Sequence, residues 1–185
     1  GINSNRGINI SSKKTHPSNH LFWLELNAIE PMFNPVTTTI SIYEKRNAAS
    51  RISSCKTFSY SQSIQARQEA IKLGYDDSLL LSTTGEICCS TTANLLIKRK
   101  EEWLTPRIES GCLPGVMRGQ GIKKGIIREA RLNCKPEPED EWLLINSLCC
   151  HPIQKVGNIT LNVYNNAKSL WFSLLEESQH IFLKE

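Results

Sequence analysis

The chain has 185 residues, of which 39% are hydrophobic and 22% charged, and its formal net charge is +4 at pH 7. This composition predicts one globular domain, or one large lobe, with a real hydrophobic core. No run of Lys or Arg alternates with aromatic residues, so the sequence does not favour nucleic-acid binding. No segment approaches the roughly 20 apolar residues of a membrane span.

Residues 1–20 are polar and are predicted to form a mobile lead-in, followed by one folded lobe over residues 21–185. Apolar and β-branched runs predict strands over residues 21–26, 36–43, 78–82, 87–88, 95–97, 103–104, 142–145 and 159–163. Helices are predicted over residues 61–73, 114–132 and 167–177. Strands mixed with a few helices, without regular alternation, predict an α/β or α+β lobe around a mixed sheet.

The seven cysteines include two adjacent pairs, Cys88-Cys89 and Cys149-Cys150. Adjacent cysteines seldom bridge each other, and no pair has zinc-ribbon or CxxC spacing. We therefore expect packed, reduced thiols. Since residues 1–19 also contain no apolar stretch of a signal peptide, a cytoplasmic location is expected.

A turn with the sequence SGCLPGVMR occupies residues 110–118. Proline is favoured at the first position of a helix, so a helix is predicted to begin at Pro114. The amides of Gly115, Val116 and Met117 would then point out of the helix N-terminus, which is a seat for phosphate. The alternative is an ordinary turn before a helix, and for the turn alone this alternative is the more common one.

Lys56 lies upstream of that turn in the Ser- and Thr-rich stretch KTFSY. A lysine combined with a phosphate seat suggests a phosphorylated aldehyde cofactor that is held as a Schiff base. For Lys56 alone, the alternative of one surface lysine among many is the more common one.

The order of these and further motifs resembles the class IV pyridoxal-phosphate aminotransferase family. The resemblance runs from about Leu21 to the C-terminus and rests on the following blocks: Lys56-Thr57 with Tyr60, residues 69–70 and 74–81, Gly85, residues 92–95, 104–106 and 111–118, and Asn146-Ser147. It implies the large cofactor-binding lobe of the fold-type IV enzymes, with pyridoxal 5'-phosphate as cofactor and a small-molecule substrate.

Within the family, the blocks are most similar to aminodeoxychorismate lyase. That similarity implies the conversion of 4-amino-4-deoxychorismate to 4-aminobenzoate and pyruvate, a step of folate biosynthesis, by a homodimer. Two alternatives stay open: an aminotransferase for branched-chain or D-amino acids, and a non-catalytic fragment that keeps the fold. The resemblance also implies a smaller N-terminal lobe that this sequence lacks.

The resemblance implies a role for individual residues. Lys56 matches the Schiff-base and proton-transferring lysine, and Tyr60 matches a tyrosine near the phenolic oxygen of the cofactor. The remaining matches are to groups that bind the cofactor phosphate. These are the backbone amides of Val116 and Met117, and a second turn at Ser147 and Leu148. A packed aromatic at Tyr60 and a plain turn residue at Ser147 are the structural alternatives.

Cys89 departs from the family pattern. The family places a glutamate five residues before the asparagine that matches Asn94, where it keeps the pyridine nitrogen protonated. A thiol stabilises that cation less. The nearest acid in the sequence is Glu86. The resemblance therefore predicts a weaker electron sink, unless Cys89 is only a packed strand residue.

Overall fold

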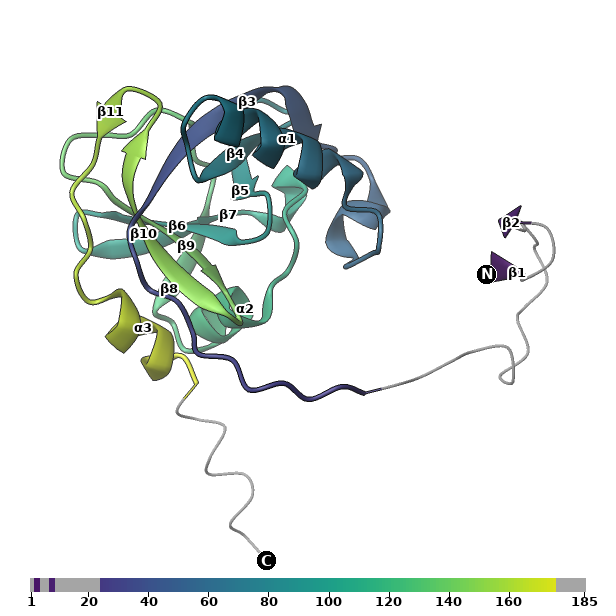
Figure 1. The fold of residues 1–185 in the computed structure, drawn as a ribbon. Helices are drawn as coiled ribbons and strands as arrows, with labels where there is room; N and C mark the ends of the chain where they lie inside the picture. Colours follow the sequence, from purple (N-terminus) through teal and green to yellow (C-terminus); the bar gives the residue numbers. More distant parts are fainter. Residues whose placement is uncertain (1, 4–6, 9–23, 176–185) are drawn as a thin grey trace, which may run out of the picture.

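The computed structural model describes residues 2–3, 7–8 and 24–175 of the chain (Figure 1). Its strands are β1 (Ile2–Asn3), β2 (Gly7–Ile8), β3 (Val36–Arg46), β4 (Asp77–Ser82), β5 (Ile87–Ser90), β6 (Asn94–Arg99), β7 (Glu102–Pro106), β8 (Ile127–Ala130), β9 (Glu141–Asn146), β10 (Cys149–Val156) and β11 (Ile159–Thr160). The α-helices are α1 (Ser61–Lys72), α2 (Val116–Lys123) and α3 (Ala167–Ser173), and two 3-10 turns are η2 (Arg51–Ser54) and η3 (Ile108–Ser110).

Six strands close into a ring. Neighbours pair in the order β10-β3-β4-β5-β6, and β9 pairs with both β6 and β10, which joins the two ends. The strands β7 and β8 continue the sheet from β6, and β11 continues it from β10. Three pairs are parallel (β10–β3, β3–β4 and β7–β8) and the others of this sheet antiparallel, so the predicted mixed sheet is confirmed.

Alternation along the strands places buried side chains on both faces of the sheet. Leu95 and Ile97 of β6 belong to a cluster to which every ring strand contributes, so this cluster fills the ring. Leu96 points to the opposite face, where it joins a second cluster with side chains of α2 and α3. A third, smaller cluster contains Ala66 of α1 and the thiols of Cys88, Cys89 and Cys112.

The helices cover two regions of the ring. Helix α1 packs on β3 and β4, whereas α2 packs on β8 and β9 and α3 on β10 (Figure 1). Helix α1 turns the buried Ala66 and Ala70, four residues apart, toward the sheet. The helix ends at Lys72, and the chain then turns as predicted at Gly74, whose φ of +83° is the left-handed conformation that favours glycine after a helix.

Two expectations about elements are wrong, and the strand predicted over residues 159–163 is only Ile159–Thr160. The helix predicted over residues 114–132 is only Val116–Lys123, because Gly125, at φ +68°, turns the chain into β8. Residues 24–26 of the strand predicted over 21–26 form no strand, and 21–23 lie outside the described residues. The pattern also missed β10, which lies between β9 and β3.

The lead-in predicted over residues 1–20 lies almost wholly outside the described residues. The exceptions are β1 and β2, which pair antiparallel with each other. In the described part of the chain, no helix has the length and apolar character needed to cross a membrane.

Candidate functional site

A cleft of about 420 Å³ lies where four connecting segments meet. These are the segment before α1, the β5–β6 turn, the loop into α2 and the β9–β10 turn. Six of the seven predicted site residues line it: Lys56, Tyr60, Cys89, Val116, Ser147 and Leu148. The exception is Met117, whose side chain is only 2% exposed and packs in the core with that of Trp171.

The start of α2 forms one wall of the cleft. The helix begins at Val116, with Gly115 as its N-cap, so the prediction that Pro114 is the first helical residue is wrong. The amide of Gly115 donates to the Leu113 carbonyl at 2.9 Å and is not free. The amides of Val116 and Met117 donate to no group within residues 24–175, so two of the three predicted donors remain for an anion.

Asn94, at the start of β6, holds the loop that leads into α2. Its Nδ2 donates to the Leu113 carbonyl at 2.8 Å. A Cβ added to Gly115 would lie 2.1 Å from Asn94 Oδ1. The glycine is therefore needed for close approach rather than for its φ of −68°, which any residue can adopt.

Asn146 organises the opposite wall, the turn between β9 and β10. Its Oδ1 accepts from the amides of Leu148 at 2.7 Å and Cys149 at 3.0 Å, and its Nδ2 donates to the Thr92 carbonyl at 3.3 Å. The carbonyl of Leu148 is also engaged, by the amide of Met32. Leu148 therefore offers the cleft a half-exposed apolar side chain, and the hydroxyl of Ser147 is the group there that can bind a ligand.

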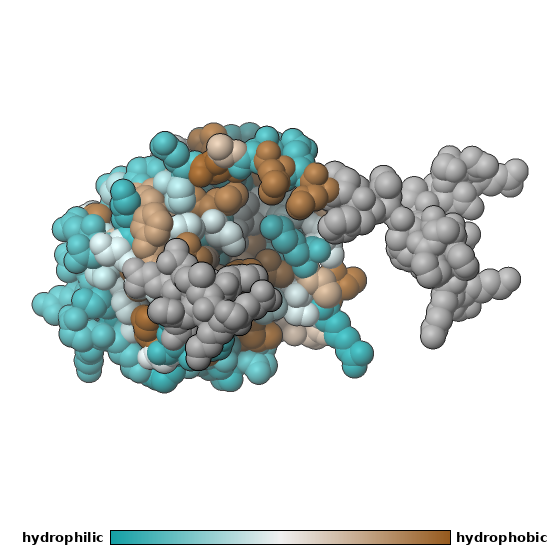
Figure 2. Space-filling view, turned by 90° about the horizontal axis from the view of Figure 1, so that it is seen from below, coloured by the Kyte–Doolittle hydropathy of each residue, from teal (hydrophilic) through white to brown (hydrophobic). Residues whose placement is uncertain are grey.

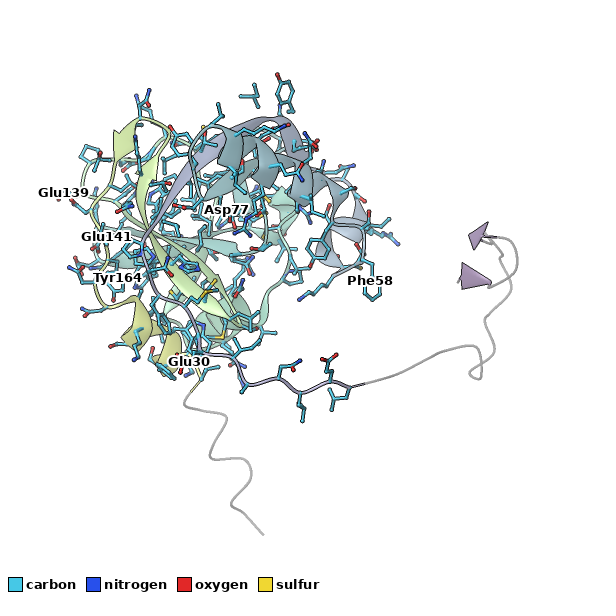
Figure 3. The ribbon with its side chains drawn as sticks, viewed as in Figure 1. Glu30, Phe58, Asp77, Glu139, Glu141 and Tyr164 are labelled. Atoms are coloured by element: carbon cyan, nitrogen blue, oxygen red, sulfur yellow. The ribbon has the colours of Figure 1, made fainter. Side chains whose placement is uncertain are left out.

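Lys56 and Tyr60 lie on an exposed segment between η2 and α1. Within the described residues, neither the Lys56 amine nor the Tyr60 hydroxyl has a hydrogen-bond or ion-pair partner. Phe58, between them, is 98% exposed and projects from the surface (Figure 3). The segment thus presents an unengaged amine and an unengaged phenol to the cleft.

Cys89 lies in β5 directly opposite Asn94 of β6, and its side chain is buried apart from its contact with the cleft. No Asp or Glu among the described residues lines the cleft. Glu86, the nearest acid in sequence, faces Arg107 and Arg131 at 3.4 and 3.6 Å. Glu86 is therefore engaged elsewhere and cannot stand in for a carboxylate at Cys89.

The thiols at the start of β10 are inert. Burial, with the Asp77 carboxylate as a second cause, raises the pKa of Cys149 to about 11, and burial beside Cys149 raises the pKa of Cys150 to about 12. All cysteines within the described residues are free, as the sequence predicts. These two thiols are protonated at neutral pH and are not nucleophiles.

The arrangement suits an anionic ligand with an aldehyde. Among the described residues, the charged side chains on the cleft wall are Lys56 and Arg46, both cationic. The free amides of α2 and the Ser147 hydroxyl can hold a phosphate, and the Lys56 amine can react with a carbonyl. Pyridoxal 5'-phosphate fits these groups, except that the described wall of the cleft carries no carboxylate to pair with its ring nitrogen.

Three residues of the site were missed as site residues. Asn94 and Asn146 belong to motifs noted in the sequence, and their amides have turn-forming chemistry that could have identified them. Arg46, which ends β3, gives no such signal, because its partners are backbone carbonyls that only the fold brings near.

The family model for amino-transferase class IV matches residues 2–156. A crystal structure named as a 4-amino-4-deoxychorismate lyase, from Legionella pneumophila, has 26% sequence identity and a TM-score of 0.69, and the match covers 82% of this chain and 58% of that one. The branched-chain aminotransferase of Thermoproteus uzoniensis has 19% identity and a TM-score of 0.70, with 80% and 53% covered. At that identity the likeness concerns the fold.

A curated relative from Synechocystis, named as a branched-chain-amino-acid aminotransferase, is 32% identical over 59 residues, which is 32% of this chain and 19% of the relative. The chain thus spans little more than half the length of these solved structures and about a fifth of the curated relative.

Proposed function

The chain belongs to the class IV aminotransferase family, and we propose that it forms the large lobe of an enzyme that carries pyridoxal 5'-phosphate on Lys56. Enzymes of this family depend on that cofactor. The observation that carries the proposal is that Lys56, whose amine is unengaged, and Val116, whose backbone amide is free, line one cleft.

Each of the predicted site residues would bind a different part of the cofactor. The amides of Val116 and Met117 and the Ser147 hydroxyl would bind the phosphate. The Tyr60 phenol would hydrogen-bond to the phenolic oxygen, and Leu148 would pack against an apolar part of the ligand. Cys89 would lie at the ring nitrogen.

We propose aminodeoxychorismate lyase as the activity, converting 4-amino-4-deoxychorismate to 4-aminobenzoate and pyruvate in folate biosynthesis. The sequence motifs and the 26% identical solved structure support this choice. The cofactor, when bound, supplies an electron-withdrawing group at the substrate amine. Lys56 would remove a ring proton and return one to the enolpyruvyl group as its C–O bond breaks, so that the products contain every atom of the substrate.

The thiol at Cys89 is compatible with elimination. Without a carboxylate at the ring nitrogen, the cofactor is a weaker electron sink, and transamination depends on that sink. Elimination gains the aromatic product as an additional driving force. The absence of an acidic residue from the described wall of the cleft therefore favours the lyase over a transaminase.

An aminotransferase for branched-chain or D-amino acids is the second candidate, and the 59-residue match to a branched-chain relative favours the branched-chain form. A fragment that keeps the fold without activity is the third. Release of pyruvate from aminodeoxychorismate without a keto-acid acceptor would separate the lyase from both. A homodimer in the cytoplasm is part of the same proposal.

Borohydride reduction tests the role of Lys56. We expect the chain, reduced with borohydride in the presence of pyridoxal 5'-phosphate, to carry a pyridoxyl group on Lys56 in peptide mapping. The label should disappear in Lys56→Ala and remain in Lys72→Ala, since Lys72 is an exposed lysine of α1 away from the cleft. A label on other lysines with none on Lys56 would refute the proposal.

A further inference from the structure

Arg46 connects the two walls of the cleft that hold Lys56 and the start of α2. Its Nε donates to the Gly111 carbonyl at 3.0 Å, and its Nη2 donates to the Ser53 carbonyl at 2.8 Å. Ser53 lies three residues before Lys56, and Gly111 lies five residues before Val116. One guanidinium therefore fixes both segments to each other.

The backbone of Arg46 is itself fixed in the sheet. Arg46 pairs with Ser82 at the end of β4, and its carbonyl accepts from the Thr83 amide at 2.8 Å. Gly111, one of the two partners of the guanidinium, is also constrained. It has φ +91°, and a Cβ there would lie 3.1 Å from the Asn47 carbonyl oxygen. Arg46 thus joins Ser53 to a rigid frame.

The segment that carries Lys56 has little else to hold it. Within residues 24–175, every other hydrogen bond of residues 50–60 runs to a position between 47 and 64. All residues from 51 to 60 are exposed except Ser53, so apolar burial contributes little. The position of Lys56 relative to α2 therefore depends on Arg46.

We propose that Arg46 is a positioning residue that sets the distance between the Lys56 amine and the phosphate seat of α2; this rests on the proposed function. Because a guanidinium stays charged at every pH of interest and donates in a planar fork, it can hold two carbonyls at once. A lysine at the same position keeps the charge but lacks the fork.

Two ligands distinguish an Arg46 that positions Lys56 from an Arg46 that only attracts an anion by its charge. Pyridoxal 5'-phosphate needs both Lys56 and the seat, whereas pyridoxine 5'-phosphate, which lacks the aldehyde, needs the seat alone. In Arg46→Gln we expect at least a tenfold loss of apparent affinity for pyridoxal 5'-phosphate, read from the borohydride-reducible adduct. The affinity for pyridoxine 5'-phosphate should change less than twofold. Arg46→Lys should resemble Arg46→Gln, and Arg51→Gln, an exposed arginine of η2, should resemble the wild type.

Equal losses for the two ligands, or full recovery in Arg46→Lys, would show that Arg46 acts through its charge and would overturn the proposal. Unchanged binding of both ligands in Arg46→Gln would overturn it as well.

Hydrogen exchange of the chain without cofactor gives a second measurement that does not depend on the proposed function. The amides of Ser53 and Cys55 donate to Ser50 and Ile52 at 3.1 and 2.9 Å. They should exchange at least tenfold faster in Arg46→Gln, while amides of β6 keep their wild-type rates. If the wild type takes no label on Lys56, the proposed function fails, and this exchange result alone decides the role of Arg46: unchanged rates would refute it.

Discussion

At the scale of single residues, the close approach of Gly115 to Asn94 shapes the phosphate seat. The Asn94 amide can reach the Leu113 carbonyl only because position 115 has no side chain. The first turn of α2 is therefore placed by a hydrogen bond from β6 that a single methyl group would displace.

Gly115→Ala should destabilise the chain by about 1–3 kcal/mol, because the new Cβ must push the Asn94 side chain away. It should also weaken the binding of pyridoxine 5'-phosphate, which depends on the seat. Gly119→Ala is the matched control, since a Cβ there meets nothing within 4 Å. In the helix interior that change should stabilise by up to about 1 kcal/mol. Urea unfolding of the two variants measures both effects, and equal stabilities would contradict the steric argument.

At the scale of elements, the loop between β8 and β9 is tied to the ring by Asp140. Arg99 of β6 donates to this buried carboxylate through Nε at 2.9 Å and Nη2 at 2.8 Å. The Asp140 carboxylate also accepts from the Glu137 amide at 2.9 Å and from Trp142 Nε1 at 3.2 Å. Since Trp142 is fully buried inside the ring, one carboxylate links a surface loop to the core.

This carboxylate makes stability depend on pH. Burial opposes ionisation, but the Arg99 guanidinium and the Glu137 amide outweigh it and hold the pKa of Asp140 below its usual range. A lowered pKa in the folded state stabilises the protein above the unfolded value of about 4, and this contribution is lost as the pH falls through the folded pKa.

Asp140→Asn should therefore cost about 1.5–3 kcal/mol at pH 7, because Arg99 loses its buried charged partner and keeps only Glu137, a half-exposed residue at 2.8 Å. The difference from the wild type should shrink as the pH falls below about 4. Glu139→Gln, which changes the exposed neighbour labelled in Figure 3, should have no such effect. Urea unfolding as a function of pH is the measurement; a difference that stays constant down to pH 2 would contradict the assignment.

The sequence predicts helices and strands correctly where local signals are strong. It fails where a segment is a strand only because neighbouring strands pair with it. Gly74 ends α1 as expected, and β3 and β9 occur where apolar and β-branched runs place them. In contrast, β10 contains polar residues and Pro152, and it is a strand because β9 and β3 flank it. The apolar Leu24 and Leu26 lie exposed without a pairing strand in the described part of the chain.

The site follows the same rule. Lys56, Cys89 and Val116 come from separate motifs, and the closed ring brings these motifs to one cleft. The order of the motifs predicts that these three residues share one site. It could not predict that Glu86 faces two arginines instead of the cleft. Nor could it predict Arg46, whose contact with Gly111 spans 65 positions.

At the scale of the whole molecule, apolar side chains are exposed around the cleft. Phe58 is 98% exposed, Val116 66% and Leu148 50%. Figure 2 shows one face of the molecule, on which brown hydrophobic patches lie between teal hydrophilic groups. Exposed apolar patches favour association with other surfaces. Exposed apolar side chains gathered around one cleft are therefore expected to be covered by a partner surface.

We therefore expect the 185-residue chain by itself to self-associate and to bind the cofactor weakly. The phosphate carries close to two negative charges, whereas the groups proposed to hold it, two backbone amides and the Ser147 hydroxyl, are uncharged. The lack of one charge-assisted hydrogen-bond partner costs about 1.5–3 kcal/mol, or roughly ten- to a hundred-fold in affinity. Sedimentation should show a dimer or larger species that dissociates in Phe58→Ser but not in Ile159→Ser, which changes an exposed residue of β11 away from the cleft. A titration should give a dissociation constant for pyridoxal 5'-phosphate weaker than about 1 μM. A monomer with a tighter cofactor complex would show that the cleft is complete within this chain.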